Sequence, residues 1–75
     1  MKGVITAVIR RNEVRPGGYG FLMGADNVER FWHASNLQDI DYNDEALVAE
    51  GLQVEFTPFE HPVKGPRAQN IRLAE

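Results

Sequence analysis

The sequence predicts an all-β fold, a small barrel that occupies the whole chain as one domain, residues 1–75. Short runs rich in β-branched and aromatic residues follow one another, and glycine, proline, asparagine and aspartate separate them. The 75 residues leave room for one domain only, since a chain this short buries about 60% of its unfolded surface. The hydrophobic fraction of 43% and the charged fraction of 25% are typical of a globular chain rather than a disordered one.

The first half of the chain predicts three strands. Val4–Ile9 is β-branched and reads as the first strand. Pro16–Gly18 is a turn signal where positive φ is needed, and Tyr19–Met23 follows it as the second strand. The third strand, Val28–His33, follows a connection at Asp26–Asn27 that is short enough for a hairpin.

The acidic segment Ala34–Glu50 separates the third strand from the fourth. Its stretch Asp44–Glu50 is compatible with one or two helical turns, with Asp44 as the N-cap and Gly51 as the C-terminal stop. The sequence therefore predicts at most one short helical turn, in the long loop after the third strand.

The last third of the chain predicts two more strands. Leu52–Thr57 alternates strictly, so that its apolar residues share one face. Pro58–Pro66 contains three prolines and is predicted as a loop, and Gln69–Leu73 closes the chain as the fifth strand. Five short strands with the longest connection after the third indicate a five-stranded antiparallel Greek-key barrel of the OB type. Closure of such a barrel removes exposed sheet edges.

Four aromatic side chains are expected to share one face of the second and third strands. Alternation places Tyr19 and Phe21 on one face of the second strand, and Phe31 and His33 on one face of the third. If the two strands pair as a hairpin, these four rings form a platform on which unpaired bases can stack. Each stacked base contributes roughly 1–3 kcal/mol, almost regardless of base identity.

The alternative is that these rings are simply part of the core. Two observations favour a platform. A core face is already available from other residues, namely Leu22, Trp32, Val54 and Phe56. In addition, Gly18 and Gly20 flank Tyr19 and leave its strand open on one side, which suits the close approach of a backbone or ligand.

Three segments, in order, resemble the cold-shock domain family. Gly18–Leu22 is similar to the first RNP motif of that family, and Arg30–His33 resembles the second. Glu50–Phe56, followed by Lys64–Ile71, is similar to its closing segment. Each motif is weak alone, but together they extend over almost the whole chain. The resemblance implies an OB barrel that binds single-stranded RNA or DNA with low sequence specificity, as an RNA chaperone or regulator of gene expression.

The resemblance also implies which residues contact nucleic acid. The implied base-stacking residues are Tyr19, Phe21, Phe31, His33 and Tyr42, with Lys64 of the Lys-Gly-Pro element beside them. The chain departs from the family where Thr6-Ala7-Val8 replaces Lys-Trp-Phe and where Ala34 replaces an aromatic residue. Two lost stacking positions correspond to roughly 2–6 kcal/mol, so we expect micromolar rather than nanomolar binding.

The net charge of −3 requires a local basic patch if the chain binds nucleic acid. Arg10, Arg11, Arg15, Lys64 and Arg67 can rim the ring face, although arginines in a turn are often simply solvated. The acidic residues cluster instead in the long loop: Asp39, Asp41, Asp44, Glu45 and Glu50. Arg30 occupies a normally apolar, inward position that the sequence does not explain.

Other classes of function have less support. The chain lacks cysteine, and His33 and His61 alone do not make a metal site. No nucleophile–base pair is visible, so no enzymatic activity and no cofactor are expected. No apolar run reaches membrane-spanning length, and a monomeric cytoplasmic protein without membrane contact is expected. The open alternative is a degenerate OB barrel that serves as a protein-interaction or regulatory module, possibly of a longer protein. The sequence does not distinguish RNA from DNA as the ligand.

Overall fold

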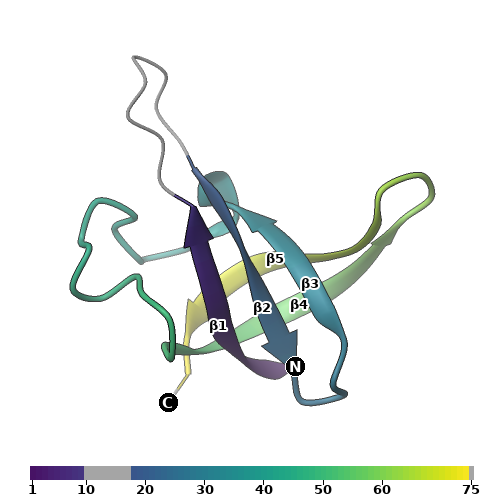
Figure 1. Ribbon diagram of the computed structural model, residues 1–75, viewed down its shortest axis with the longest axis horizontal. Coiled ribbons are helices and arrows are strands. Elements are labelled where there is room, and N and C mark those ends of the chain that lie inside the picture. Colours follow the sequence, from purple (N-terminus) through teal and green to yellow (C-terminus); the bar gives the residue numbers. More distant parts are fainter. Residues whose placement is uncertain (10–17, 75) are drawn as a thin grey trace.

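The computed structural model describes residues 1–9 and 18–74, and in it five strands form a closed ring (Figure 1). The strands are β1 (Lys2–Ile9), β2 (Tyr19–Gly24), β3 (Glu29–His33), β4 (Gln53–His61) and β5 (Gly65–Leu73). Their order around the ring is β1-β2-β3-β5-β4, with β4 returning to β1. This is the predicted all-β, OB-type Greek-key barrel. Neighbouring strands are antiparallel except β3 and β5, which pair in parallel.

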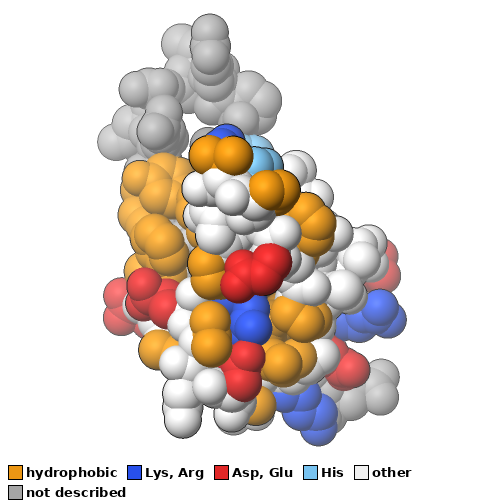
Figure 2. Space-filling model, turned by 90° about the vertical axis from the view of Figure 1, so that its right-hand side faces the viewer, with side chains coloured by type: hydrophobic (Ala, Val, Ile, Leu, Met, Phe, Trp, Pro, Cys, Tyr) orange, Lys and Arg blue, Asp and Glu red, His pale blue; other side chains and the backbone are white. Residues whose placement is uncertain are grey.

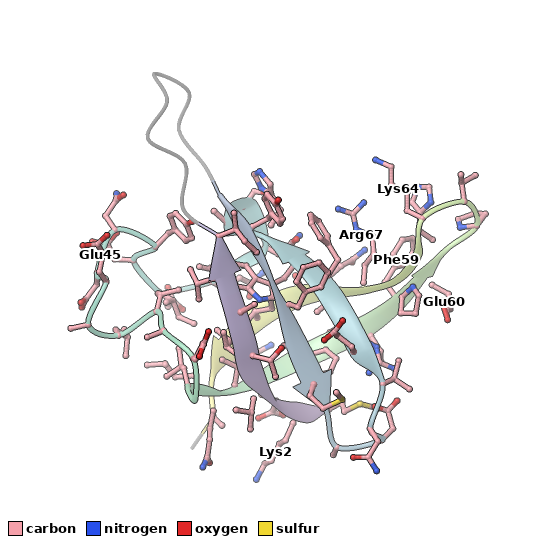
Figure 3. All side chains as sticks on the ribbon, viewed as in Figure 1. Lys2, Glu45, Phe59, Glu60, Lys64 and Arg67 are labelled. Atoms are coloured by element: carbon pink, nitrogen blue, oxygen red, sulfur yellow. The ribbon has the colours of Figure 1, made fainter. Side chains whose placement is uncertain are left out.

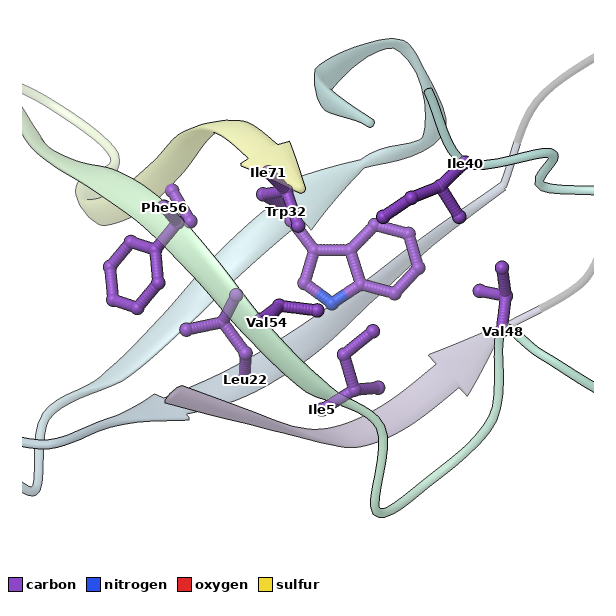
Figure 4. Packing of buried hydrophobic residues seen from close by; sticks show 9 residues of the cluster. Ile5, Leu22, Trp32, Ile40, Val48, Val54, Phe56 and Ile71 are labelled. Carbon is purple, nitrogen blue, oxygen red and sulfur yellow. The ribbon is translucent and has the colours of Figure 1, made fainter. Parts of the chain in front are cut away.

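The barrel interior is filled by apolar side chains that alternate with outward-facing ones along each strand. Trp32 of β3 is completely buried at its centre (Figure 4). Its neighbours in the core are Ile5, Leu22, Ile40, Val48, Val54, Phe56, Ala68 and Ile71. The prediction that Leu22, Trp32, Val54 and Phe56 supply the core is therefore confirmed.

The fourth and fifth strands are longer than predicted. The segment Pro58–Pro66 was predicted as a loop, but β4 continues to His61 and β5 already begins at Gly65. Pro58 is tolerated because β4 pairs with β1 only at its first residues, Gln53–Glu55, so that the later part of β4 is an edge, and Pro62 lies in the turn between the strands. The consequence is a long β4–β5 hairpin that projects beyond the ring (Figure 1).

A bulge in β5 changes its alternation. Glu55 pairs with Arg72 and Thr57 pairs with Gln69, so β5 contains one more residue than β4 in this interval. Asn70 lies within it with φ of 50°, a left-handed conformation that asparagine adopts more readily than most residues. The extra residue keeps Ile71 directed into the core.

The prediction of at most one short helical turn in the long loop is confirmed, but the turn lies elsewhere than expected: Asp44–Glu50 consists of turns and bends, with one α-type hydrogen bond from the Val48 N–H to the Asp44 carbonyl at 2.9 Å. The Asp44 carboxylate does accept a hydrogen bond from the Leu47 N–H at 3.2 Å, as an N-cap would. Seven residues are too few to offset the cost of helix nucleation, and Val48 is instead buried in the core. Among the described residues, the helical element is a 3-10 helix, Ala34–Asn36, directly after β3.

Gly18 and Gly20 make room for interior side chains. A Cβ at Gly20 would lie 2.5 Å from Cζ2 of the Trp32 indole, and one at Gly18 would collide with the Tyr42 hydroxyl. The expected close approach of a backbone is also present, because a Cβ at Gly20 would collide with the Ala7 carbonyl oxygen and one at Gly18 would lie 2.6 Å from the Ile9 carbonyl oxygen. The two glycines allow Trp32 and Tyr42 to pack closely against β2.

Candidate nucleic-acid interface

Four rings form a platform on the outside of the β2–β3 hairpin. Tyr19 pairs with His33 and Phe21 pairs with Phe31, so all four side chains leave the same face of the sheet. The Tyr19 and Phe31 rings stack with centroids 5.5 Å apart and planes at 28°. Phe21 meets Phe31 edge-on, with centroids 6.0 Å apart. None of the four residues belongs to the buried core among the described residues, and each is at least partly exposed on the outside of the barrel.

His33 is oriented by the 3-10 helix that follows it. Its Nδ1 accepts a hydrogen bond from the Ser35 N–H at 3.1 Å, while the Asn36 side chain accepts one from the His33 N–H at 2.9 Å. In the neutral ring the proton then sits on Nε2. The imidazole is exposed, and this hydrogen bonding holds it in place beside Tyr19.

Arg67 extends the platform from β3 onto β5. Its guanidinium carbon lies 4.5 Å from the centroid of the Phe31 ring, within cation–π range. Lys64, at the tip of the β4–β5 hairpin, lies on the same side as Arg67 (Figure 3). Lys64, Arg67, Phe21 and Phe31 line a hollow of about 360 Å³. Ring faces and positive charges are therefore close enough to contact a base and its phosphate together.

Acidic and basic side chains are separated only in part, because Glu60 lies on β4, in the same hairpin as Lys64 (Figure 3). Glu45 in the long acidic loop and Lys64 in the hairpin lie on opposite sides of the molecule (Figure 3). Figure 2 looks onto the hairpin side and shows hydrophobic side chains gathered at the upper left, with acidic side chains below them. Lys64 and Arg67 thus border the platform although the net charge of the chain is negative.

Tyr42, a predicted stacking residue, does not join the platform in the structure. Tyr42 packs edge-on against Trp32 with ring centroids 6.2 Å apart, and its hydroxyl donates a hydrogen bond to the Ile9 carbonyl at 3.2 Å. Its visible role is thus to cover the core. Arg10 lies outside the described residues, as do Arg11 and Arg15.

Phe59 is a candidate site residue that the sequence analysis missed. It lies in the segment that was predicted as a proline-rich loop, whereas in the structure it pairs with Arg67 across β4 and β5. Its side chain is 40% exposed. The signal that points to it is the alternation of β4: Val54 and Phe56 face inward, so continuation of the strand turns Phe59 outward.

Arg30 holds the β2–β3 turn to the end of the barrel. It is only 9% exposed and donates two hydrogen bonds to the Asp26 carboxylate, at 2.9 and 2.7 Å. Its guanidinium also lies 5.4 Å from the Phe56 ring centroid. These contacts give the inward-facing Arg30 a structural role. The Asp26 carboxylate offsets the free-energy cost of burying the guanidinium charge.

The hydrogen bonds from Arg30 lower the pKa of Asp26 from 3.8 to about 2, and those to Asp26 raise the pKa of Arg30. A carboxyl group whose pKa is lower in the folded protein than in the unfolded chain stabilises the fold at pH values above the unfolded pKa. This contribution is lost as the pH falls from 3.8 towards 2.

Asp26→Asn is therefore expected to lower the free energy of unfolding at neutral pH and to make it depend less on pH between 3.8 and 2. Urea unfolding at a series of pH values measures both effects. The exposed Glu29→Gln on the same hairpin is the control, and equal acid profiles for wild type and Asp26→Asn would contradict the prediction.

Metal-binding groups and membrane-spanning helices were also sought among the described residues. Within residues 1–9 and 18–74, no group of three or more His, Asp or Glu side chains is placed to hold a metal ion. No helix in the same part of the chain is long and apolar enough to cross a membrane.

Comparison with known proteins does not assign a family. No family model matches the chain, and no curated protein matches it. The resemblance to cold-shock domains remains a hypothesis that rests on the sequence motifs.

Proposed function

We propose that this protein binds single-stranded nucleic acid through the platform formed by Tyr19, Phe21, Phe31 and His33, as a divergent cold-shock-type domain. The observation that carries the proposal is the register of β2 and β3, which brings four rings together outside the core. Rings in this arrangement stack on bases of any identity. The arrangement therefore favours a ligand whose bases are unpaired and whose sequence is variable.

Arg67 and Lys64 give the platform its affinity for the phosphate backbone. Both residues border the hollow beside Phe21 and Phe31, so a base stacked there carries its phosphate within their reach. Neutralisation of phosphates releases counterions, which makes such binding dependent on salt. Binding of this kind holds a strand open and shifts the folding equilibrium of an RNA without making or breaking a covalent bond. The proposed role is that of an RNA chaperone or regulator of gene expression in the cytoplasm.

A labelled seven-nucleotide pyrimidine oligomer, as RNA and as DNA, tests this function in a fluorescence anisotropy titration over a series of salt concentrations. We expect micromolar affinity at low salt that weakens as salt is added. Lys64→Gln is expected to make the logarithmic salt slope shallower by about 0.7, the value for one phosphate contact on a single strand. Absence of binding at tens of micromolar protein in low salt would overturn the proposal.

A further inference from the structure

A row of in-register residues continues the platform across the barrel. Phe21 of β2 pairs with Phe31 of β3, Phe31 pairs with Arg67 of β5, and Arg67 pairs with Phe59 of β4. Neighbouring residues in register point to the same face of a sheet. The four strands thus present ring, ring, guanidinium and ring in succession, and the platform does not end at β3.

Phe59 occupies the end of this row. β4 pairs with β1 only at Gln53–Glu55, so at the level of Phe59 no strand of the described chain lies beyond β4. The ring is among the exposed large hydrophobic side chains, and its contact with the His61 ring, 6.3 Å between centroids, is edge-on. With 40% of its surface exposed, Phe59 keeps part of its ring accessible to a base.

A second hollow lies between Phe59 and the platform. It has a volume of about 280 Å³, and its lining includes His33, Asn36, Phe59, Arg67 and Gln69. The hollow therefore combines an aromatic wall and a cation with two side-chain amides, which are donors and acceptors for the edge of a base. Arg67 also borders the hollow beside Phe21 and Phe31, so one guanidinium separates two adjoining sites.

We propose that Phe59 is an additional base-stacking residue, and that the hollow beside it accepts the base next to those held by Phe21 and Phe31. This inference rests on the proposed function. The bound strand then runs across β2, β3, β5 and β4, with Arg67 between neighbouring bases. The Phe59 site replaces part of the stacking surface that is lost in β1, where Ala7 pairs with Phe21 and offers no ring.

The test is a length series of homopyrimidine oligomers, from three to eight nucleotides, titrated against wild type and Phe59→Ala. Wild-type affinity is expected to rise with length until every site is occupied and then to level off. The affinity of Phe59→Ala is expected to level off at an oligomer one nucleotide shorter. Its affinity for the longest oligomer is expected to be lower than that of wild type by about tenfold or more. Phe59→Leu keeps an apolar side chain without a ring and is expected to behave like the alanine variant. Val63→Ala is the matched control, because Val63 is 88% exposed on the same hairpin.

The possible outcomes separate this inference from the proposed function. If Phe59→Ala binds every length as wild type does, while Tyr19→Ala with Phe31→Ala loses binding, the Phe59 site is wrong and the platform stands. If Phe59→Ala weakens all lengths equally without moving the plateau, Phe59 supports Arg67 and does not stack on a base, which also overturns the inference. If wild type binds no oligomer of any length, both proposals fail.

Discussion

Tyr19→Ala combined with Phe31→Ala is expected to remove measurable binding to the seven-nucleotide pyrimidine oligomer. Each ring contributes roughly 1–3 kcal/mol of stacking, so the pair amounts to about 2–6 kcal/mol. At about 1.4 kcal/mol per tenfold change, affinity falls by about 30-fold or more. Starting from micromolar binding, the double variant leaves the range of an anisotropy titration.

Phe31 is the central residue of this prediction because it contacts both other parts of the interface. Its ring stacks on Tyr19 at 5.5 Å and lies 4.5 Å from the Arg67 guanidinium carbon. Removal of Phe31 therefore deletes a stacking surface and also releases the cation that would contact the phosphate. The loss in the double variant is expected to exceed the loss from Lys64→Gln, which removes one charge only.

The controls separate lost recognition from lost folding. Tyr19 and Phe31 are partly buried, so the Tyr19→Leu and Phe31→Leu pair is tested beside the alanine pair. Leucine keeps apolar volume but offers no ring, and circular dichroism reports whether each variant is folded. Val28→Ala, at the far end of the same hairpin, is expected to bind as wild type does. Unchanged affinity in a folded leucine pair would exclude the ring platform as the binding site.

The platform was predictable from the sequence because it depends on local rules. A strand has a period of two residues, and a short turn at Asp26–Asn27 sets the register of the hairpin. The turn forms as expected, with Asn27 at φ of 62° and its N–H donating to the Gly24 carbonyl at 2.9 Å. Period and register together place Tyr19 and Phe21 beside His33 and Phe31.

What the sequence analysis missed depends on contacts between distant segments. The extension of β4 to His61 is decided by pairing with β5, which outweighs the loop signal of the prolines. His61 also ends that strand: its Nδ1 accepts from the N–H groups of Val63 and Lys64, at 3.1 and 3.0 Å. Phe59 was missed with the strand that carries it.

The structural roles of single residues were equally hidden. Gly20 is explained by the Ala7 carbonyl of β1 and the Trp32 indole of β3, which both approach it closely. Arg30 is explained by the carboxylate of Asp26, four residues earlier in the chain. The alternation of the strand shows that Arg30 faces inward but does not reveal this partner. Pattern analysis predicts which face a side chain occupies, but the group that it meets there is set by tertiary packing.

Trp32→Ala is expected to remove a large part of the stability of the protein. The indole is completely buried, with Leu22, Val54 and Ile71 also in the core. Removal of a buried aromatic ring costs about 3–5 kcal/mol, whereas a domain of this size has a total stability of roughly 4–11 kcal/mol. Because the platform strands β2 and β3 both line this core, oligonucleotide binding is expected to fall with the folded fraction.

Trp32→Phe tests whether the loss of stability in Trp32→Ala comes from lost packing in the core. Phenylalanine retains part of the buried ring, and it removes an indole N–H that has no hydrogen-bond partner within the described chain. A buried donor without a partner costs about 1–3 kcal/mol, so its removal offsets part of the lost packing. Urea unfolding is therefore expected to rank wild type and Trp32→Phe well above Trp32→Ala. Trp32→Ala with a stability within about 1 kcal/mol of wild type would contradict a core centred on this residue, and the barrel geometry that presents the platform would then need another explanation.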